Sequence, residues 1–334
     1  MQPNILEVNN LTTTFTSQRK SFNAVDGISF QVAKGETLGI VGESGCGKSV
    51  TSLSIMGLVK APGKVTGKSI QFDGVDLLNL SNKEMRRLRG NEMSMIFQEP
   101  MTSLNPVFSI GDQIGESIRI HKKLKGKERK EKVIELLKQV GIPRPDEIYD
   151  NYPHQLSGGM RQRIMIAMAM ACDPKLIIAD EPTTALDVTI QAQILELIKD
   201  LQVKKGMSMI LITHDLGVVS EVCDRIVVMY AGKVVETGPV QEVLRNPEHP
   251  YTKGLLASLP KKGHNKNRLN YIPGQVPAPL NWGKGCRFAD RCSSVMSQCH
   301  IAVPSLIKVN EYQESACWLA SKGRESDVSL ETAR

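Results

Sequence analysis

The sequence predicts an α/β fold built around a buried parallel sheet, and two observations carry this prediction. The segments LIIAD (176–180) and MSMILITHD (207–215) are continuous apolar runs, as found in strands that a parallel sheet buries on both faces. Residues 127–142 have the helical period instead. Their apolar positions recur at i, i+3, i+4 and i+7, namely Val133, Leu136, Leu137 and Val140. Strands that alternate with such helices are typical of an α/β core.

The other elements follow in chain order. Short β-like runs separated by turns fill residues 1–50, and TSLSIMGLVK (51–60) has a helical pattern. MSMIF (93–97) ends a segment as a short buried strand, and the pattern from 105 to 150 is helical. RIVVMYAGKVVETG (225–238) predicts two strands joined by the turn AGK.

Composition changes after about residue 255. The stretch LPKKGHNKNRLNYIPGQVPAPLNWGKG is rich in Pro, Gly, Asn and Lys and has little periodicity. We therefore expect a main domain over 1–256 and a small loop-rich C-terminal domain over 257–334.

Overall composition is that of a globular protein. Hydrophobic residues make up 41% of the 334 residues and charged residues 23%, with a formal net charge of +7. The basic run HKKLKGKERKEK (121–132) is interpreted as a solvated helix face, with phosphate or nucleic-acid binding as the alternative. The N-terminus has no signal-peptide pattern and the apolar runs are short, so we expect a cytoplasmic protein, in which clustered cysteines favour metal binding over disulfides.

A glycine-rich segment, GESGCGKS (42–49), predicts a phosphate-binding loop. It fits G-x-x-x-x-G-K-[ST], follows the apolar strand TLGIV and precedes a helix that starts at about residue 48. Glycines let backbone N–H groups point at phosphate oxygens, and the positive end of the helix adds to the attraction. Lys48 would meet the β- and γ-phosphates and Ser49 would bind Mg²⁺.

Two carboxylates end the strand in KLIIADEP (175–182). Asp180 is expected to hold Mg²⁺, and Glu181 to polarise the attacking water. A helix N-terminus is the alternative interpretation, and the upstream phosphate loop makes it the weaker one.

The segment LSGGMRQR (156–163) opens a helix with a hydroxyl and two bare glycines, which favours anion binding, and it has no Lys that would make it a second phosphate loop. With these motifs in this order, residues 5–260 resemble the ATP-binding subunits of ABC transporters. The resemblance implies a P-loop NTPase of the ABC type, with a RecA-like core, an antiparallel β subdomain and a helical subdomain at about 100–165. Met160 departs from the usual LSGGQ.

The resemblance also implies roles for further residues. Gln98 matches the glutamine that contacts Mg²⁺ or water, and His214 matches the switch histidine near the γ-phosphate. Phe15, with Phe22 as the alternative, matches the aromatic residue that stacks on adenine. The nucleotide-binding set implied in this way is Phe15, Gly42, Ser44, Gly45, Cys46, Gly47, Lys48, Ser49, Val50, Ser157 and Gly159.

What the family does follows from the same resemblance. Two such chains close head to tail around ATP, identical or not, and hydrolysis lets them part. The expected partners are a second ABC ATPase subunit, two transmembrane permease subunits docked on the helical subdomain, and indirectly an extracellular substrate-binding protein. The chain would lie on the cytoplasmic face of the membrane and bind no nucleic acid.

QEPMTSLNP (98–106) and NPEHPYTKGLLASLP (246–260) resemble the dipeptide and oligopeptide importers, a group that includes nickel importers. Peptide import is therefore the expected function, and nickel import the first alternative. A soluble ABC ATPase of DNA repair or translation is a further alternative, disfavoured because we find one cassette and no heptads.

Four of the seven cysteines lie late in the chain: Cys286, Cys292, Cys299 and Cys317. Their spacing is wider than the usual zinc pairs, and four thiolates on a loop-rich segment suit a [4Fe–4S] cluster. Some members of the peptide-importer family carry such a cluster, and C-x-F-x-x-R-C (286–292) resembles their pattern. Zinc binding and free thiols remain alternatives.

Overall fold

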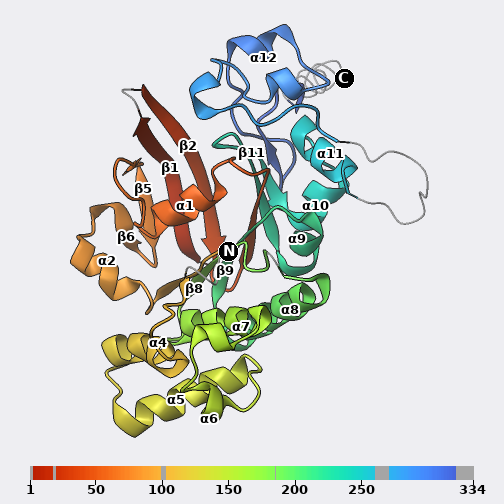
Figure 1. Ribbon diagram of the computed structural model, residues 1–334. Helices are drawn as coiled ribbons and strands as arrows, with labels where there is room; N and C mark the ends of the chain where they lie inside the picture. Colours follow the sequence, from red (N-terminus) through yellow and green to blue (C-terminus); the bar gives the residue numbers. More distant parts are fainter. Residues whose placement is uncertain (1–2, 18–19, 99–102, 185, 260–270, 321–334) are drawn as a thin grey trace.

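The computed structural model describes residues 3–17, 20–98, 103–184, 186–259 and 271–320. Parts of the segment 98–106 and of the predicted C-terminal domain lie outside these described residues. In Figure 1 a sheet core lies in the middle, helices α4, α5 and α6 lie below it, and the C-terminal residues around α12 lie above it. None of the described helices is both long and apolar enough to cross a membrane.

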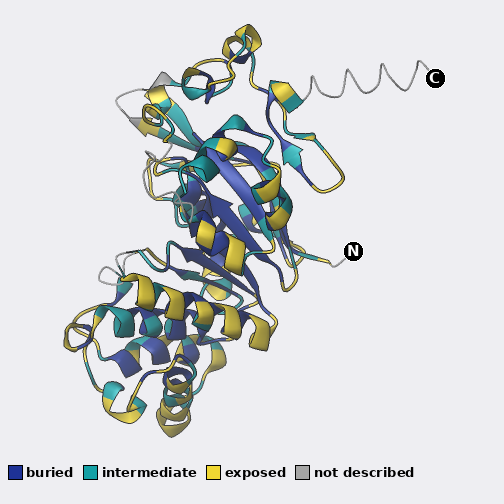
Figure 2. Cartoon of the chain, turned by 90° about the vertical axis from the view of Figure 1, so that its right-hand side faces the viewer, coloured by how far each residue is buried: buried dark blue, intermediate teal, exposed yellow. Residues whose placement is uncertain are grey.

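The central sheet has eight strands among the described residues, in the order β12-β13-β11-β10-β3-β9-β8-β7. The strands β10, β3, β9, β8 and β7 run parallel, and every residue of β3, β8 and β9 is buried. Figure 2 shows these strands as a dark band inside the molecule. The prediction of a buried parallel sheet and of the β10–β11 hairpin is confirmed. The bounds are β3 (Thr37–Val41), β7 (Met93–Ile96), β8 (Leu176–Asp180), β9 (Ser208–Thr213), β10 (Arg225–Tyr230), β11 (Lys233–Pro239), β12 (Ile307–Lys308) and β13 (Glu314–Ser315).

A second, antiparallel sheet is the β subdomain expected from the resemblance. Within the described part of the chain it has five strands, ordered β2-β1-β5-β6, with β4 paired to β1. The bounds are β1 (Asn4–Ser17), β2 (Lys20–Ala33), β4 (Lys64–Thr66), β5 (Ser69–Phe72) and β6 (Val75–Asp76).

Two helices have predicted bounds. The amphipathic helix expected over residues 127–142 is confirmed as α5, and the helix expected from about residue 48 to residue 60 is confirmed at its start only. The expected start of α1 at Lys48 is confirmed, but the expected end at residue 60 is wrong, since α1 ends at Ile55. Gly57 has a φ of 61°, the left-handed conformation in which helices commonly terminate. The bounds are α1 (Lys48–Ile55), α2 (Asn82–Leu88), α4 (Ile110–Ser117), α5 (Gly126–Gln139), α6 (Pro145–Ile148), α7 (Gly158–Met170), α8 (Val188–Lys205), α9 (Leu216–Val222), α10 (Val240–Arg245), α11 (Pro250–Ala257) and α12 (Ser297–Ile301). Short helical turns are η1 (Leu77–Asn79), η2 (Ile118–Lys122), η3 (Pro153–Gln155), η4 (Pro279–Asn281) and η5 (Ala289–Arg291).

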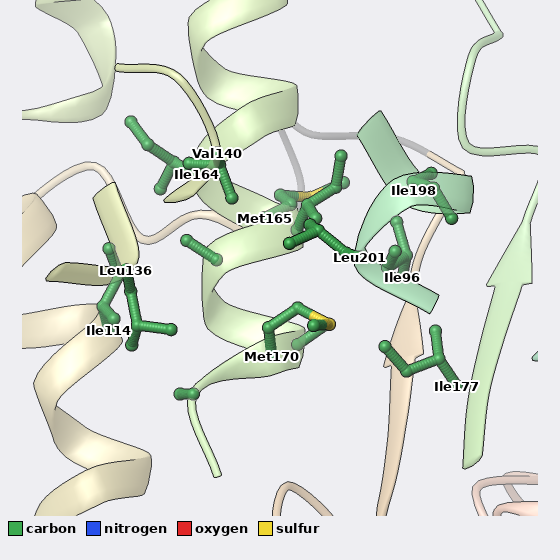
Figure 3. Packing of buried hydrophobic residues seen from close by; sticks show 14 of the residues in the cluster. Ile96, Ile114, Leu136, Val140, Ile164, Met165, Met170, Ile177, Ile198 and Leu201 are labelled. Carbon is green, nitrogen blue, oxygen red and sulfur yellow. The ribbon is translucent and has the colours of Figure 1, made fainter. Parts of the chain in front are cut away.

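The helices α4, α5 and α7 share one apolar core, which is continuous with β7, β8 and α8. Figure 3 shows Leu136 and Val140 of the α5 region pointing toward α7, where Ile164 and Met165 lie. All four apolar positions predicted for this helix are buried. The basic run beside them is largely exposed, as a solvated helix face requires.

The C-terminal part packs directly on the cassette. β13 pairs with β11 and so extends the central sheet. Phe288 contacts the rings of Tyr230 in β10 and Tyr251 in α11, with ring centroids 5.1 and 5.4 Å apart. The division of the chain at residue 257 stays a prediction.

Candidate functional site

The predicted phosphate-binding loop joins the end of β3 to α1, as the motif requires. Gly47 has a φ of 101°, and a side chain there would strike the carbonyl oxygen of Ala24, so the position needs glycine. Lys48 Nζ is buried in the loop and donates to the carbonyls of Gly42 (2.8 Å) and Glu43 (3.2 Å). The ammonium group is therefore held at the loop that would surround phosphate oxygens.

The other residues of the loop and the start of α1 differ in how far they are buried. Ser44 and Gly45 are exposed on the loop surface, and Val50 is half-buried in α1. Cys46 is fully buried, and burial raises the pKa of its thiol. Only the backbone of Cys46 is therefore available to a nucleotide.

Ser49 and Asp180 meet beside this loop. Ser49 Oγ donates to Asp180 Oδ1 at 3.0 Å. Burial raises the pKa of the Asp180 carboxyl, and the charge of Glu181 adds to the rise, although the hydrogen bond from Ser49 opposes it. A divalent cation bound to these two oxygens would offset that cost, and hydroxyl and carboxylate oxygens are ligands that Mg²⁺ prefers.

Glu181 brings the three predicted catalytic side chains together. Its carboxylate accepts a hydrogen bond from Gln98 Nε2 at 2.9 Å, and His214 Nδ1 lies 3.5 Å from its other oxygen. Gln98 follows β7, Glu181 follows β8 and His214 follows β9. The carboxyl ends of parallel strands meet at one edge of a sheet, which is where open α/β sheets bind their ligands.

Thr184 is a member of this cluster that sequence reasoning missed. Its Oγ1 donates to the same Glu181 oxygen as Gln98, at 3.0 Å. The sequence feature that could have identified Thr184 is a hydroxyl residue three positions after the carboxylate, close enough for the two side chains to meet. Thr184 and Gln98 together fix the direction of the Glu181 carboxylate.

Ser157 and Gly159 lie outside this cluster. Ser157 caps α7, where its Oγ accepts the Met160 N–H at 3.3 Å, and it is exposed. Among the described residues, the hydrogen bonds that join Ser49, Asp180, Gln98, Glu181 and His214 include neither of them. These hydrogen bonds of the described residues thus do not join the two segments that are predicted to bind anions.

Comparison with known proteins shows the family of this chain. Residues 25–184 match the model of the ABC transporter family, and residues 235–299 match that of the oligopeptide/dipeptide transporter C-terminal region. The oligopeptide transport ATP-binding protein AppD of Bacillus subtilis (strain 168) is 54% identical over 316 residues, which cover 94% of this chain and 96% of that protein. The dipeptide transport ATP-binding protein DppD of Escherichia coli (strain K12) is 51% identical over 313 residues, with the same coverage.

The chain belongs to the ATP-binding subunits of oligopeptide and dipeptide ABC transporters. It is an ATP hydrolase of the ABC type with the corresponding fold. The dimeric post-hydrolysis structure of the ATP-binding cassette MJ0796, bound to ADP and Pi, superposes with a TM-score of 0.64 at 27% identity. The match covers 70% of this chain and 98% of that one.

The aromatic residue predicted to stack on adenine lies on β1 of this ABC subunit. Phe15 stacks on Phe22 of β2, with ring centroids 6.0 Å apart. The two residues proposed as alternatives are therefore one pair at the end of the β1–β2 hairpin. A role in adenine binding stays a prediction.

The four late cysteines of the ABC subunit gather around one cavity of ≈ 10 Å³, the size of a single water site. Burial raises the pKa of Cys286 to about 11, and the three other thiols add to the rise. Among the described residues, however, no group of three or more His, Cys, Asp or Glu side chains is arranged to hold a metal ion. The four thiols line one cavity, but in this arrangement they do not fit a metal cluster.

Proposed function

We propose that ATP hydrolysis by this chain drives the import of di- or oligopeptides through separate transmembrane subunits. The single observation that carries the proposal is the hydrogen-bonded set at the ends of β7, β8 and β9, in a chain about half identical to transport ATP-binding proteins for these cargoes. The substrate class rests on those relatives.

From this geometry we infer a role in hydrolysis for each side chain. The backbone N–H groups of the loop and Lys48 would bind the phosphates, with the N-terminus of α1 behind them. Mg²⁺ held by Ser49, Asp180 and Gln98 would neutralise phosphate charge. Glu181 orients water and takes its proton as the water oxygen attacks the γ-phosphorus and the bond to ADP breaks. His214 lies beside Glu181 and would contact the γ-phosphate.

The exposed start of α7 favours a dimer. Ser157 and Gly159 would bind the γ-phosphate on the loop of a second ABC ATPase subunit, identical or not, so each site needs both chains. The similar ATP-binding cassette MJ0796 is dimeric in its solved structures, which supports a dimer.

A surface between the sheet core and the helical part suits the permeases. A cavity of ≈ 220 Å³ is lined by Met95, Phe97 and Met165, among others, and Phe97 directly precedes Gln98. A permease helix docked there would sense movement at Gln98. We infer two transmembrane permeases, a peripheral position on the cytoplasmic face, and an extracellular binding protein as an indirect partner.

The experiment that tests this function is transport in proteoliposomes with the cognate permeases and binding protein. Uptake of labelled dipeptide that requires ATP, with ATPase activity stimulated by peptide-loaded binding protein, is expected. Uptake of Ni²⁺ without peptide uptake would establish the nickel alternative instead.

For the four cysteines we propose a [4Fe–4S] cluster as a structural staple of the C-terminal domain over 257–334. Their gathering around one cavity supports it, and binding would require the thiols to rearrange, since no group of three or more His, Cys, Asp or Glu of the described residues is arranged to hold a metal ion. Iron, acid-labile sulfide and zinc should be measured on protein purified without oxygen, and on Cys292→Ser. About four irons and four sulfides, lost in the variant, are expected; one zinc or no metal would refute the cluster.

A further inference from the structure

One residue of the phosphate-binding loop, Glu43, is held by the C-terminal part of the chain. Arg291 Nη1 donates to Glu43 Oε2 at 2.7 Å, and Nη2 donates to Oε1 at 3.0 Å. This two-pronged pair is the strongest geometry that an arginine makes with a carboxylate. The Arg291 side chain is only 6% exposed, so the guanidinium side of the pair is shielded from water, while the Glu43 side chain is 31% exposed. Nothing in the loop motif itself requires a partner 248 residues away.

Arg291 is itself fixed in place. Its Nε donates to the carbonyl of Pro273 at 2.9 Å, and its Nη2 donates to those of Ile272 and Gly274. Nη1 also donates to the hydroxyl of Tyr230 at 3.3 Å. The guanidinium group therefore reaches Glu43 from a rigid frame and loses little freedom in doing so.

Glu43 has a second contact with the C-terminal third. Its backbone N–H donates to the hydroxyl of Tyr251 at 2.8 Å. Tyr251 lies in α11, is fully buried, and packs edge-on against Tyr230 with centroids 4.7 Å apart. The carbonyl of Glu43 in turn accepts from Lys48 Nζ. One residue thus links the C-terminal frame to the phosphate-binding lysine.

A second arginine of the same segment, Arg287, contacts residues that flank the loop. Arg287 pairs with Asp26 and donates to the carbonyl of Ala231. The next residue, Gly232, donates its N–H to the carbonyl of Cys46 at 2.9 Å. Arg287 directly follows Cys286 and Arg291 directly precedes Cys292. This short segment therefore contacts the loop directly through Arg291, and contacts the residues flanking the loop through Arg287.

We propose that Arg291 is a positioning residue for ATP binding: through Glu43 it holds the phosphate-binding loop in its binding conformation. A loop with three glycines has many conformations to lose when it binds phosphate, and a rigid contact removes that cost in advance. The catalytic side chains follow other strands, so the effect should fall on ATP affinity rather than on hydrolysis of bound ATP.

The test is a double-mutant cycle with Arg291→Ala, Glu43→Ala and the double variant in the full-length chain, with Arg291→Lys as the conservative variant. Equilibrium ATP affinity, KM, kcat and melting temperature are measured for each. Arg225→Ala is the matched control. It removes the Arg225–Glu36 ion pair (3.1 Å), which is also partly buried but lies at the opposite end of β3 and β10.

Each single variant is expected to weaken ATP affinity and raise KM about tenfold, which is about 1.4 kcal/mol, with kcat changed less than about twofold. The double variant should be no worse than the more affected single variant, because both remove one contact. Arg291→Lys, which keeps the charge without the fork, should fall between. The control should melt earlier with KM unchanged.

Two results would overturn the proposal. One is a KM unchanged in both single variants, with only the melting temperature lowered, as in the control. The other is a double variant whose effect equals the product of the two single ones. If Arg291→Ala does not fold, Glu43→Ala decides alone, because Glu43 is a half-exposed loop residue whose truncation leaves the C-terminal frame intact.

Discussion

Glu181, the proposed catalytic base, has an uncommon backbone conformation. Its φ of 46° is in the left-handed region, which residues other than glycine seldom adopt. Backbone strain of this kind is concentrated at functional sites. The conformation turns the carboxylate from the end of β8 toward Gln98 and His214. The backbone N–H of Glu181 donates to the carbonyl of Ile212 in β9 at 2.9 Å, and this hydrogen bond stabilises the strained conformation.

From this geometry we predict that Glu181→Gln retains ATP binding and loses turnover. The amide keeps the shape but cannot take a proton from water, so kcat should fall by at least about 100-fold, the usual contribution of general base catalysis. ATP affinity by equilibrium titration and phosphate release on the same preparation check it. Glu196→Gln, on an exposed face of α8, is the control and should keep wild-type turnover. Turnover near the wild-type rate in Glu181→Gln would assign the proton to another group.

At the scale of elements, sequence patterns predicted what local chemistry determines. The buried strands around 176–180 and 208–213 and the face of α5 follow from hydrophobic period, and the glycine-rich loop follows from its spacing. The β12–β13 pair could not be predicted, because two-residue strands carry no period and their pairing with β11 joins distant segments.

The same distinction holds for the site. The order of motifs predicted Lys48, Asp180, Glu181 and His214. In the structure Ser49 donates to Asp180, Gln98 donates to Glu181, and His214 lies 3.5 Å from Glu181. The contact of Arg291 with Glu43 depends on how the C-terminal part packs on the cassette, and no local pattern reports that packing.

The start of α11 predicts a pH-dependent stability. His249 caps this helix, its Nδ1 accepts the Tyr251 N–H at 3.0 Å, and burial, with a smaller effect of Lys253, lowers its pKa to about 3. Below pH 6.5, the ordinary pKa of histidine, His249 binds a proton in the unfolded chain but stays neutral in the folded chain until the pH approaches 3. The contribution of His249 to the free energy of unfolding is therefore complete above pH 6.5 and is lost as the pH falls toward 3.

We expect this free energy to fall by up to about 1.4 kcal/mol per pH unit over that window on account of His249. His249→Asn keeps a capping acceptor but cannot titrate, so its urea midpoint should change less between pH 7.5 and 5. His154→Asn, which changes an exposed histidine, should retain the wild-type slope. An equal slope in wild type and His249→Asn would show that the acid loss comes from other groups.

At the scale of the whole molecule, the C-terminal part is joined to the nucleotide site as well as to the sheet. β13 continues the central sheet, and the segment between Cys286 and Cys292 carries both arginines that contact the phosphate-binding loop or its flank. The backbone N–H of Cys286 donates to the carbonyl of Cys299 at 2.7 Å, so the cysteine group and the arginines belong to one packed unit. A change at the thiols should therefore alter the affinity of the chain for ATP.

We predict that Cys292→Ser raises KM for ATP in the same direction as Arg291→Ala. Cys292 is the next residue after Arg291, and loosening its packing frees the guanidinium from Glu43. In an Arg291→Ala background the serine substitution should add no more than about a twofold change, because the contact it acts through is already gone. Cys172→Ser changes a buried thiol after α7, far along the chain from this segment, and should leave KM unaltered. Steady-state ATPase assays on the four variants check this. Equal increases in both backgrounds would mean that the cysteines act on the nucleotide site by a route that bypasses Arg291.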